Sequence, residues 1–215
     1  MLSVDAILFD LDGTLIDSKK DLADSVHHIQ KKYGRPPSPE DEIARFIGDG
    51  VDKLVERAIG RRGPRELEEA VNLFKAHYRA HALDTTSVYV GVREALEHFK
   101  SKKMAVVTNK PVRISKRILQ GLGLAPYLPV VLGGDSVSRK KPDPEGVFLA
   151  LDQLGIRRTR DALLIGDSYQ DVLAGRAAGV RTCGIVSNIG DPQLLLQSGP
   201  DISIHSLADL RRVVC

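Results

Sequence analysis

The stretch Ala6-Ile7-Leu8-Phe9-Asp10-Leu11-Asp12-Gly13-Thr14 decides the interpretation of the chain, because a short apolar run ends directly on two carboxylates. The run has the composition of a buried strand. An unpaired carboxylate at the end of such a strand is costly to desolvate unless a cation or hydrogen bonds compensate it. Asp10 and Asp12 therefore indicate a cation and phosphoryl chemistry, although Asp-Gly after a strand is also an ordinary turn sequence.

Two further apolar runs end on polar side chains. The run Ala162–Ile165 leads into Gly166-Asp167-Ser168-Tyr169-Gln170-Asp171, and the run Met104–Val107 leads into Thr108-Asn109-Lys110. In an open parallel α/β sheet, ligands bind outside the carboxyl ends of the strands, near the point where the strand order reverses. The three strand ends therefore favour one shared site.

The composition indicates an ordinary globular protein. Of the 215 residues, 42% are hydrophobic and 27% are charged, and no apolar run approaches the roughly 18 residues of a membrane span. The formal net charge of +3 is small and dispersed, so we expect neither a nucleic-acid nor a membrane partner. We expect a cytoplasmic location, because Asp5 interrupts the first apolar stretch and no basic region precedes it. Cys183 and Cys215 have no metal-ligand or disulfide spacing.

The periodicity divides the chain into two parts. After the first strand the pattern is helical up to about Tyr89, with no strand expected, whereas strand and helix signals alternate from Val92 onward. We predict an α/β fold: a doubly wound parallel-sheet core of Rossmann-like type, with a small helical cap domain inserted after the first strand. The core comprises residues 1–15 and 90–215, and the cap comprises residues 16–89.

Individual elements follow from the same signals. Ser18 and Asp21 are a candidate capping pair for the first cap helix, which stops near Gly34. Further cap helices are expected through Ile43 and Phe46, at Val51–Ile59 and at Pro64–His81. In the core we expect strands at Val130–Leu132, Ala162–Ile165 and Thr182–Val186, and helices near Val92–Phe99, Ile114–Leu119, Val147–Leu154, Val172–Ala178 and Leu207–Val213.

Together, the motifs identify a family resemblance. The motifs of this chain, in order, are Asp10-Leu11-Asp12-Gly13-Thr14, Thr108, Lys141-Pro142 and Gly166-Asp167-Ser168-Tyr169-Gln170-Asp171. They resemble the four motifs of the haloacid dehalogenase-like hydrolase superfamily. The helical insert resembles the small cap of the phosphoglycolate phosphatase-like branch, as does its segment Phe46–Val51. Val90 departs from the pattern, because relatives commonly place Pro before the following Gly. The hinges of the cap are expected near Ile16–Asp17 and Tyr89–Gly91.

The candidate catalytic residues have distinct physical roles. Asp10 is the candidate nucleophile, which would form an aspartyl phosphate. Asp12 is the candidate acid/base, which would protonate the leaving oxygen and later accept a proton from water. Thr108 and Lys141 are candidates to bind the transferring phosphoryl group, with Asn109 as a further substrate-binding candidate.

The acids require a counter-charge, and Mg²⁺ is the natural one. The resemblance implies that Asp10 and Asp167 bind the ion directly and that Asp12 does so through its main-chain carbonyl. It leaves open whether Asp171 binds directly or through water.

The leading functional hypothesis is a Mg²⁺-dependent phosphatase for a small phosphorylated metabolite, with 2-phosphoglycolate as the first substrate to try. The protein would be a monomer or a homodimer. Arg45 and Lys53 flank the cap segment and could meet a substrate carboxylate. Alternatives are a phosphomutase of the β-phosphoglucomutase type, a phosphonate hydrolase that uses Lys53 as a Schiff base, and a non-catalytic binding module on the same scaffold. A haloacid dehalogenase would have no need for Asp12.

Overall fold

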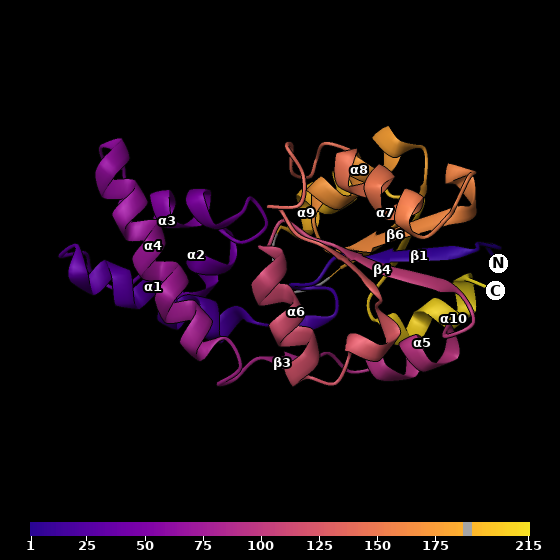
Figure 1. The fold of residues 1–215 in the computed structure, drawn as a ribbon, viewed down its shortest axis with the longest axis horizontal. Coiled ribbons are helices and arrows are strands. Elements are labelled where there is room, and N and C mark those ends of the chain that lie inside the picture. Colours follow the sequence, from indigo (N-terminus) through magenta and orange to yellow (C-terminus); the bar gives the residue numbers. More distant parts are fainter. Residues whose placement is uncertain (187–190) are drawn as a thin grey trace.

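A parallel six-stranded sheet forms the centre of the larger part of the molecule in the computed structural model, which describes residues 1–186 and 191–215 (Figure 1). The strands lie in the order β5-β4-β1-β6-β7-β8. They are β1 (Ala6–Phe9), β4 (Lys103–Val107), β5 (Val130–Leu132), β6 (Ala162–Gly166), β7 (Arg181–Ile185) and β8 (Ile202–Ile204). The chain runs from β1 to β4 and β5 on one side, then from β6 to β7 and β8 on the other. The predicted doubly wound α/β core is therefore confirmed, with its reversal point between β1 and β6.

Helices cover both faces of this sheet (Figure 1). One face carries α5 (Val92–His98), α6 (Val112–Gly121) and α10 (Leu210–Val213). The other face carries α7 (Glu145–Gln153), α8 (Tyr169–Ala178) and α9 (Pro192–Gln197). Among the described residues the core also contains the short 3₁₀ turns η1 (Ala125–Tyr127), η2 (Thr159–Asp161) and η3 (Leu207–Asp209).

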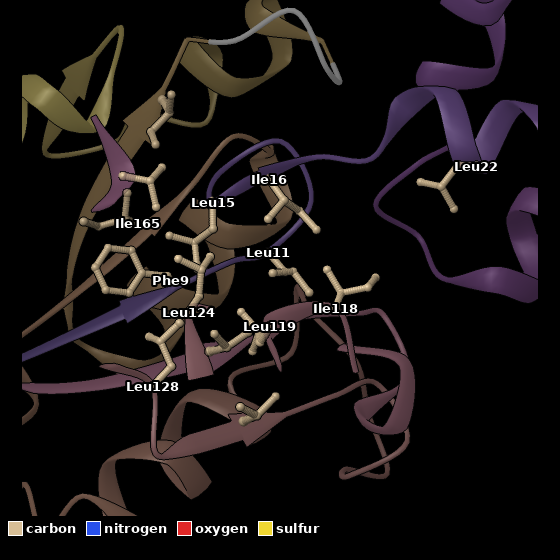
Figure 2. Close-up of a cluster of buried hydrophobic side chains, with 14 of the residues drawn as sticks. Phe9, Leu11, Leu15, Ile16, Leu22, Ile118, Leu119, Leu124, Leu128 and Ile165 are labelled. Atoms are coloured by element: carbon tan, nitrogen blue, oxygen red, sulfur yellow. The ribbon is translucent and has the colours of Figure 1, made fainter. Parts of the chain in front are cut away.

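Burial on both faces explains why β1 is continuously apolar. Ile7 and Phe9 belong to one hydrophobic cluster and Ala6 and Leu8 to another, because side chains alternate between the two faces of a strand. Figure 2 shows Phe9 in the first cluster with Leu119, Leu124 and Leu128. Burying a side chain of this size stabilises the fold by ~1.5–3 kcal/mol. The strand is thus fixed on both sides where it delivers Asp10.

A helical segment lies beside the sheet, on the left in Figure 1. It contains α1 (Lys19–Lys32), α2 (Glu40–Ala44), α3 (Val51–Ile59) and α4 (Pro64–His81). Its two connections to the core form a short antiparallel pair, β2 (Ile16–Asp17) and β3 (Ser87–Val88). Helices α3 and α4 have the bounds that the sequence predicted. That residues 16–89 form a separate cap domain stays a prediction.

Several elements differ from those expected. The strands β2 and β3 lie in the segment where no strand was expected, and β8 was not predicted. The helix expected at Leu207–Val213 is divided into η3 and α10. Ser18 stands at the start of α1 but makes no side-chain capping bond, because its hydroxyl donates to Asp12 at 2.5 Å. No helix among the described residues is long and apolar enough to cross a lipid bilayer.

Candidate active site

Three adjacent strands deliver the central residues of the site. Asp10 follows β1, Thr108 follows β4 and Asp167 follows β6, and these strands are neighbours in the sheet. Lys141 comes from the loop between β5 and α7. Most of the predicted residues line one cavity of about 60 Å³, namely Asp10, Asp12, Thr108, Asn109, Lys141 and Asp167.

Three buried carboxylates meet at the reversal point of the sheet. Asp10, Asp167 and Asp171 each place an oxygen within 4.8 Å of the others. Lys141 Nζ lies 2.9 Å from Asp10 Oδ1 and 2.5 Å from Asp171 Oδ1, and the lysine side chain is only 4% exposed. Thr14 Oγ1 donates a hydrogen bond to Asp167 Oδ1 at 3.3 Å. One lysine thus faces three carboxylates.

This acid cluster has unbalanced negative charge. Burial raises the pKa of Asp10 to about 6, although Lys141 opposes the shift. Burial, with repulsion from Asp10 and Asp171, also raises the pKa of Asp167 well above its usual range. The same two carboxylates hold the pKa of Lys141 above its ordinary value, although burial opposes this. A cluster of hard oxygen ligands with excess negative charge fits a divalent cation such as Mg²⁺.

Asp171 is held by hydrogen bonds on both of its carboxylate oxygens. Its Oδ1 accepts from Lys141 Nζ, and its Oδ2 accepts from the hydroxyl of Ser168 at 2.5 Å and the amide of Ser168 at 3.2 Å. Ser168 and Asp171 also form a capping box at the start of α8, in which the Ser168 side chain accepts from the Asp171 amide and the Asp171 carboxylate accepts from the Ser168 amide. Asp171 therefore fixes both the position of Lys141 and the loop that carries Asp167.

Asp12 faces away from the acid cluster toward a second buried lysine. Lys110 Nζ donates to both of its carboxylate oxygens, at 2.8 and 2.9 Å, and Ser18 donates to Oδ1. Lys110 Nζ also lies 4.6 Å from the ring centroid of Tyr78 on α4. Burial opposes the positive charge, but the Asp12 carboxylate outweighs it and holds the pKa of Lys110 above its ordinary value. The two carboxylates of the first motif thus have separate partners.

The backbone around Thr108 and the side chain of Asn109 are used within the protein. The amide of Thr108 donates to Leu132 O at 3.0 Å, and its hydroxyl accepts from the amide of Lys110 at 3.3 Å, which leaves the hydroxyl proton for a ligand in the cavity that Thr108 lines. Asn109 donates from Nδ2 to Lys141 O at 3.0 Å and to Gly48 O at 2.7 Å, and its Oδ1 accepts from Lys141 N at 2.9 Å. Asn109 thus holds the Lys141 loop and the segment around Gly48 together.

The helical segment closes the cavity with apolar groups. A second contact between this segment and the core joins Gln170 Nε2 to Asp49 Oδ1 at 2.7 Å. Lys53 is exposed and paired with Glu56, and Arg45 is also exposed, so neither lines the cavity. The residues of the segment that do line it are Leu22, Ile47, Gly48, Gly50, Val51, Leu54 and Phe74.

Sequence reasoning did not assign a role to Lys110. The residue stands inside the quoted run Thr108-Asn109-Lys110, directly after a buried strand, and that position was the available signal. A lone lysine after a strand usually extends into solvent. Its burial depends on Asp12, 98 positions earlier in the chain.

Comparisons with known proteins define the family. The sequence profile of the family described as haloacid dehalogenase-like hydrolase matches residues 7–185. The chain therefore belongs to the haloacid dehalogenase-like hydrolase family, as its four motifs predicted, and it is an enzyme of the hydrolase class.

Relatives within this family are similar over most of their length. Phosphoglycolate phosphatase 1 of Pseudomonas aeruginosa is 37% identical over 213 residues, which cover 95% of this chain and 77% of that protein. The phosphoglycolate phosphatase of Aquifex aeolicus is 40% identical over 178 residues, 82% of each chain. A crystal structure from Haemophilus somnus 129PT, described as a "predicted phosphoglycolate phosphatase", has a TM-score of 0.93 at 30% identity and covers 99% of each chain.

Proposed function

We propose that the protein is a Mg²⁺-dependent phosphatase that hydrolyses a small phosphomonoester, with 2-phosphoglycolate as the first substrate to test. The observation that carries this proposal is the buried meeting of Asp10, Asp167 and Asp171 with Lys141 at the reversal point of the sheet. The two relatives of 37% and 40% identity are named for phosphoglycolate, which supports the choice of substrate.

Asp10 is the proposed nucleophile. A carboxylate oxygen of Asp10 attacks phosphorus, the bond between phosphorus and the ester oxygen breaks, and an aspartyl phosphate forms. Lys141, 2.9 Å from Asp10 Oδ1, neutralises charge on the transferring group, and the hydroxyl of Thr108 donates to a phosphoryl oxygen. Asn109 keeps the Lys141 loop in place through its three hydrogen bonds.

Asp12 is the proposed acid and base. It gives a proton to the ester oxygen as the alcohol leaves, and it then takes a proton from the water that hydrolyses the aspartyl phosphate. The carboxylate of Asp12 is bonded to Lys110 and Ser18 and not to Lys141. This separation from the acid cluster supports a role for Asp12 in proton transfer that differs from the role of Asp10 as nucleophile.

The acid cluster would hold Mg²⁺ through the carboxylates of Asp10 and Asp167 and the main-chain carbonyl of Asp12, with Asp171 bound directly or through water. When bound, the ion supplies positive charge against the phosphoryl oxygens. The apolar residues Leu54 and Phe74 exclude bulk water above the site, which strengthens these electrostatic interactions. In this role residues 16–89 act as a cap domain.

Phosphate release from 2-phosphoglycolate by the purified protein tests the proposal. We expect turnover with Mg²⁺, none in excess chelator, and recovery when Mg²⁺ is restored. The Asp10→Asn variant should lose more than about 10³-fold in kcat because it lacks the nucleophile. A folded Asp10→Asn protein that retains activity, or turnover that persists in chelator, would contradict the mechanism. Conversion of a sugar phosphate to its isomer without phosphate release would favour the mutase instead.

A further inference from the structure

Lys110 is a second buried cation in the active-site cavity, and the proposed chemistry gives it no role. Its side chain is 5% exposed and lines the cavity together with Asp10 and Asp12. Nζ lies within 2.9 Å of both oxygens of Asp12, and the ring of Tyr78 covers it from α4. Lys110 thus lies between Asp12, the proposed acid and base, and Tyr78 of the helical segment.

Structural stability does not account for this arrangement. Taking a lysine and a carboxylate out of water costs several kcal/mol per ion, and a well-packed apolar pair is often as stable. A buried pair of charges inside a substrate cavity therefore points to a charged ligand more than to a folding role.

Apart from the main-chain amides at the start of α3, the rest of the cavity wall offers few groups that could bind an anion. The lining groups contributed by the helical segment are apolar side chains and glycines. Among the described lining residues the cations are Lys110 and Lys141, and Lys141 is already engaged by Asp10 and Asp171. Arg45 and Lys53 are exposed and outside the cavity.

A wider, basic cleft begins at the same lysine. It has a volume of about 680 Å³ and lies between α3 and α4 of the helical segment and α6 of the core. Lys110 lines both this cleft and the inner cavity. The acidic residues that line the cleft are Asp52 and Asp135. The basic residues outnumber them and are Lys75, Arg79, Lys110, Arg113, Arg117 and Lys140. Such a field favours the approach of a ligand with more than one negative group.

We propose that Lys110 binds a carboxylate on the leaving alcohol, so that the site selects phosphomonoesters whose ester carbon carries a carboxylate. This inference rests on the proposed phosphatase activity. Asp12 must come within hydrogen-bond distance of the ester oxygen to protonate it, and Lys110 Nζ is bonded to the same carboxylate. An ammonium has three donors: two are bonded to Asp12 and the remaining side of Nζ faces the ring of Tyr78 at 4.6 Å, so a ligand carboxylate would take the third donor in place of that contact. In 2-phosphoglycolate a single methylene separates the ester oxygen from the carboxylate, which places that carboxylate beside Nζ.

The test compares two substrates that differ in one charge. We would measure kcat/KM for 2-phosphoglycolate and for 2-hydroxyethyl phosphate, in which a neutral CH₂OH replaces the carboxylate. Wild-type protein should prefer 2-phosphoglycolate by about 10- to 100-fold, the range of a hydrogen bond to a charged group. In Lys110→Met both values fall because Asp12 loses its partner, but the preference should shrink to within about threefold.

Two further variants sharpen the result. Lys110→Arg retains a cation and should retain most of the preference, whereas Lys53→Met removes an exposed lysine outside the cavity and should leave the preference unchanged. An equal loss on both substrates in Lys110→Met would overturn the inference, because Lys110 would then only position Asp12. If Lys110→Met does not fold, the wild type and Lys110→Arg decide the matter. A wild-type ratio of kcat/KM for the two substrates near unity overturns the inference, and a strong preference for 2-phosphoglycolate that Lys110→Arg keeps supports it. Wild-type protein that releases phosphate from neither ester overturns the proposed function as well.

Discussion

Lys110 and Lys141 divide the carboxylates of the site between them. Lys141 is paired with Asp10 and Asp171, and Lys110 is paired with Asp12. Lys141 could be singled out from the sequence because it precedes a proline in a motif. Lys110 could not, because whether a lysine after a strand is buried depends on partners from distant parts of the chain.

The acid cluster requires glycine at position 13, because any side chain there would collide with Asp167. Gly13 has φ +81°, and a Cβ at this position would lie 2.0 Å from Asp167 Oδ2. We predict that Gly13→Ala displaces the Asp167 carboxylate, so that Mg²⁺-dependent phosphate release falls at least about 100-fold while the protein stays folded. Steady-state kinetics with a Mg²⁺ titration measures the effect.

Gly34→Ala is the matched control for this variant. Gly34 also has positive φ, +64°, but a Cβ there would meet nothing within 4 Å. The control carries a backbone strain of ~1–2 kcal/mol and should lower thermal stability without changing kcat. If Gly13→Ala kept the same kcat as Gly34→Ala, the close approach of residue 13 to Asp167 would not be a requirement of the site.

At the scale of elements, the first turn of α1 is hydrogen-bonded through Asp21 to the segment that leads from the helical segment back to the core. Asp21 accepts hydrogen bonds from the amides and hydroxyls of Thr85 and Thr86, at 2.6–3.2 Å. Thr86 directly precedes β3, which pairs with β2. Asp21 therefore fastens the two connections of the helical segment to one another.

We predict that Asp21→Asn destabilises the protein by ~1–3 kcal/mol at pH 7, because the amide replaces one acceptor oxygen by a donor. Burial alone would raise the pKa of Asp21, but the hydrogen bonds from Thr85 and Thr86 outweigh it and hold the pKa below 3.8. The stabilisation is therefore present above pH 3.8 and is lost as the pH falls through the lower pKa of the folded state. Urea unfolding from pH 7 to pH 3 should show the difference between wild type and variant shrinking at the acidic end.

Asp24→Asn is the control on the same helix. Asp24 pairs with Lys20, and both side chains are substantially exposed, so its loss should cost less than ~0.5 kcal/mol at any pH. A difference between wild type and Asp21→Asn that is constant with pH would show that the carboxylate charge of Asp21 does not matter.

The sequence predicted elements with a clear apolar run or helical periodicity, including the three-residue edge strand β5, but it missed three other short strands. Helices α3 and α4 have strong apolar periodicity or a clear first-turn proline, and their bounds were as expected. The strands β2 and β3 have two residues each, and β8 has three at the edge of the sheet. Such strands carry no periodicity of their own and form because tertiary contacts bring their partners together.

At the scale of the whole molecule, stability depends on the charge of the buried acid cluster. Burial raises the pKa of Asp10 from 3.8 to about 6 and also raises the pKa of Asp167 well above its usual range. A carboxyl whose pKa is raised on folding stabilises the protein at low pH, and this stability is lost as the pH rises through 3.8 to about 6. Without metal, the cluster therefore opposes folding near neutral pH.

We predict that Mg²⁺ raises the melting temperature much more at pH 7.5 than at pH 5, because protons compete for the same oxygens at the lower pH. At about 100 times its Kd the ion adds ~2.7 kcal/mol, which corresponds to roughly 5–10 °C for a protein of this size. Differential scanning fluorimetry with Mg²⁺ or chelator measures the shift. Asp167→Asn should reduce it at pH 7.5, and equal shifts of the wild type at both pH values would contradict the proposed Mg²⁺ site.

The sequence by itself determined the doubly wound core, the helical insert, the family and the acids at the strand ends. Those features follow from local apolar periodicity and from motifs that are contiguous in the chain. Only the tertiary structure decided which lysine faces which carboxylate, that Asn109 clamps Gly48, and that Asp21 fastens the returning chain. The physical reason is that burial and pairing of a charge depend on groups many positions apart, which meet only when the sheet and the helical segment have packed.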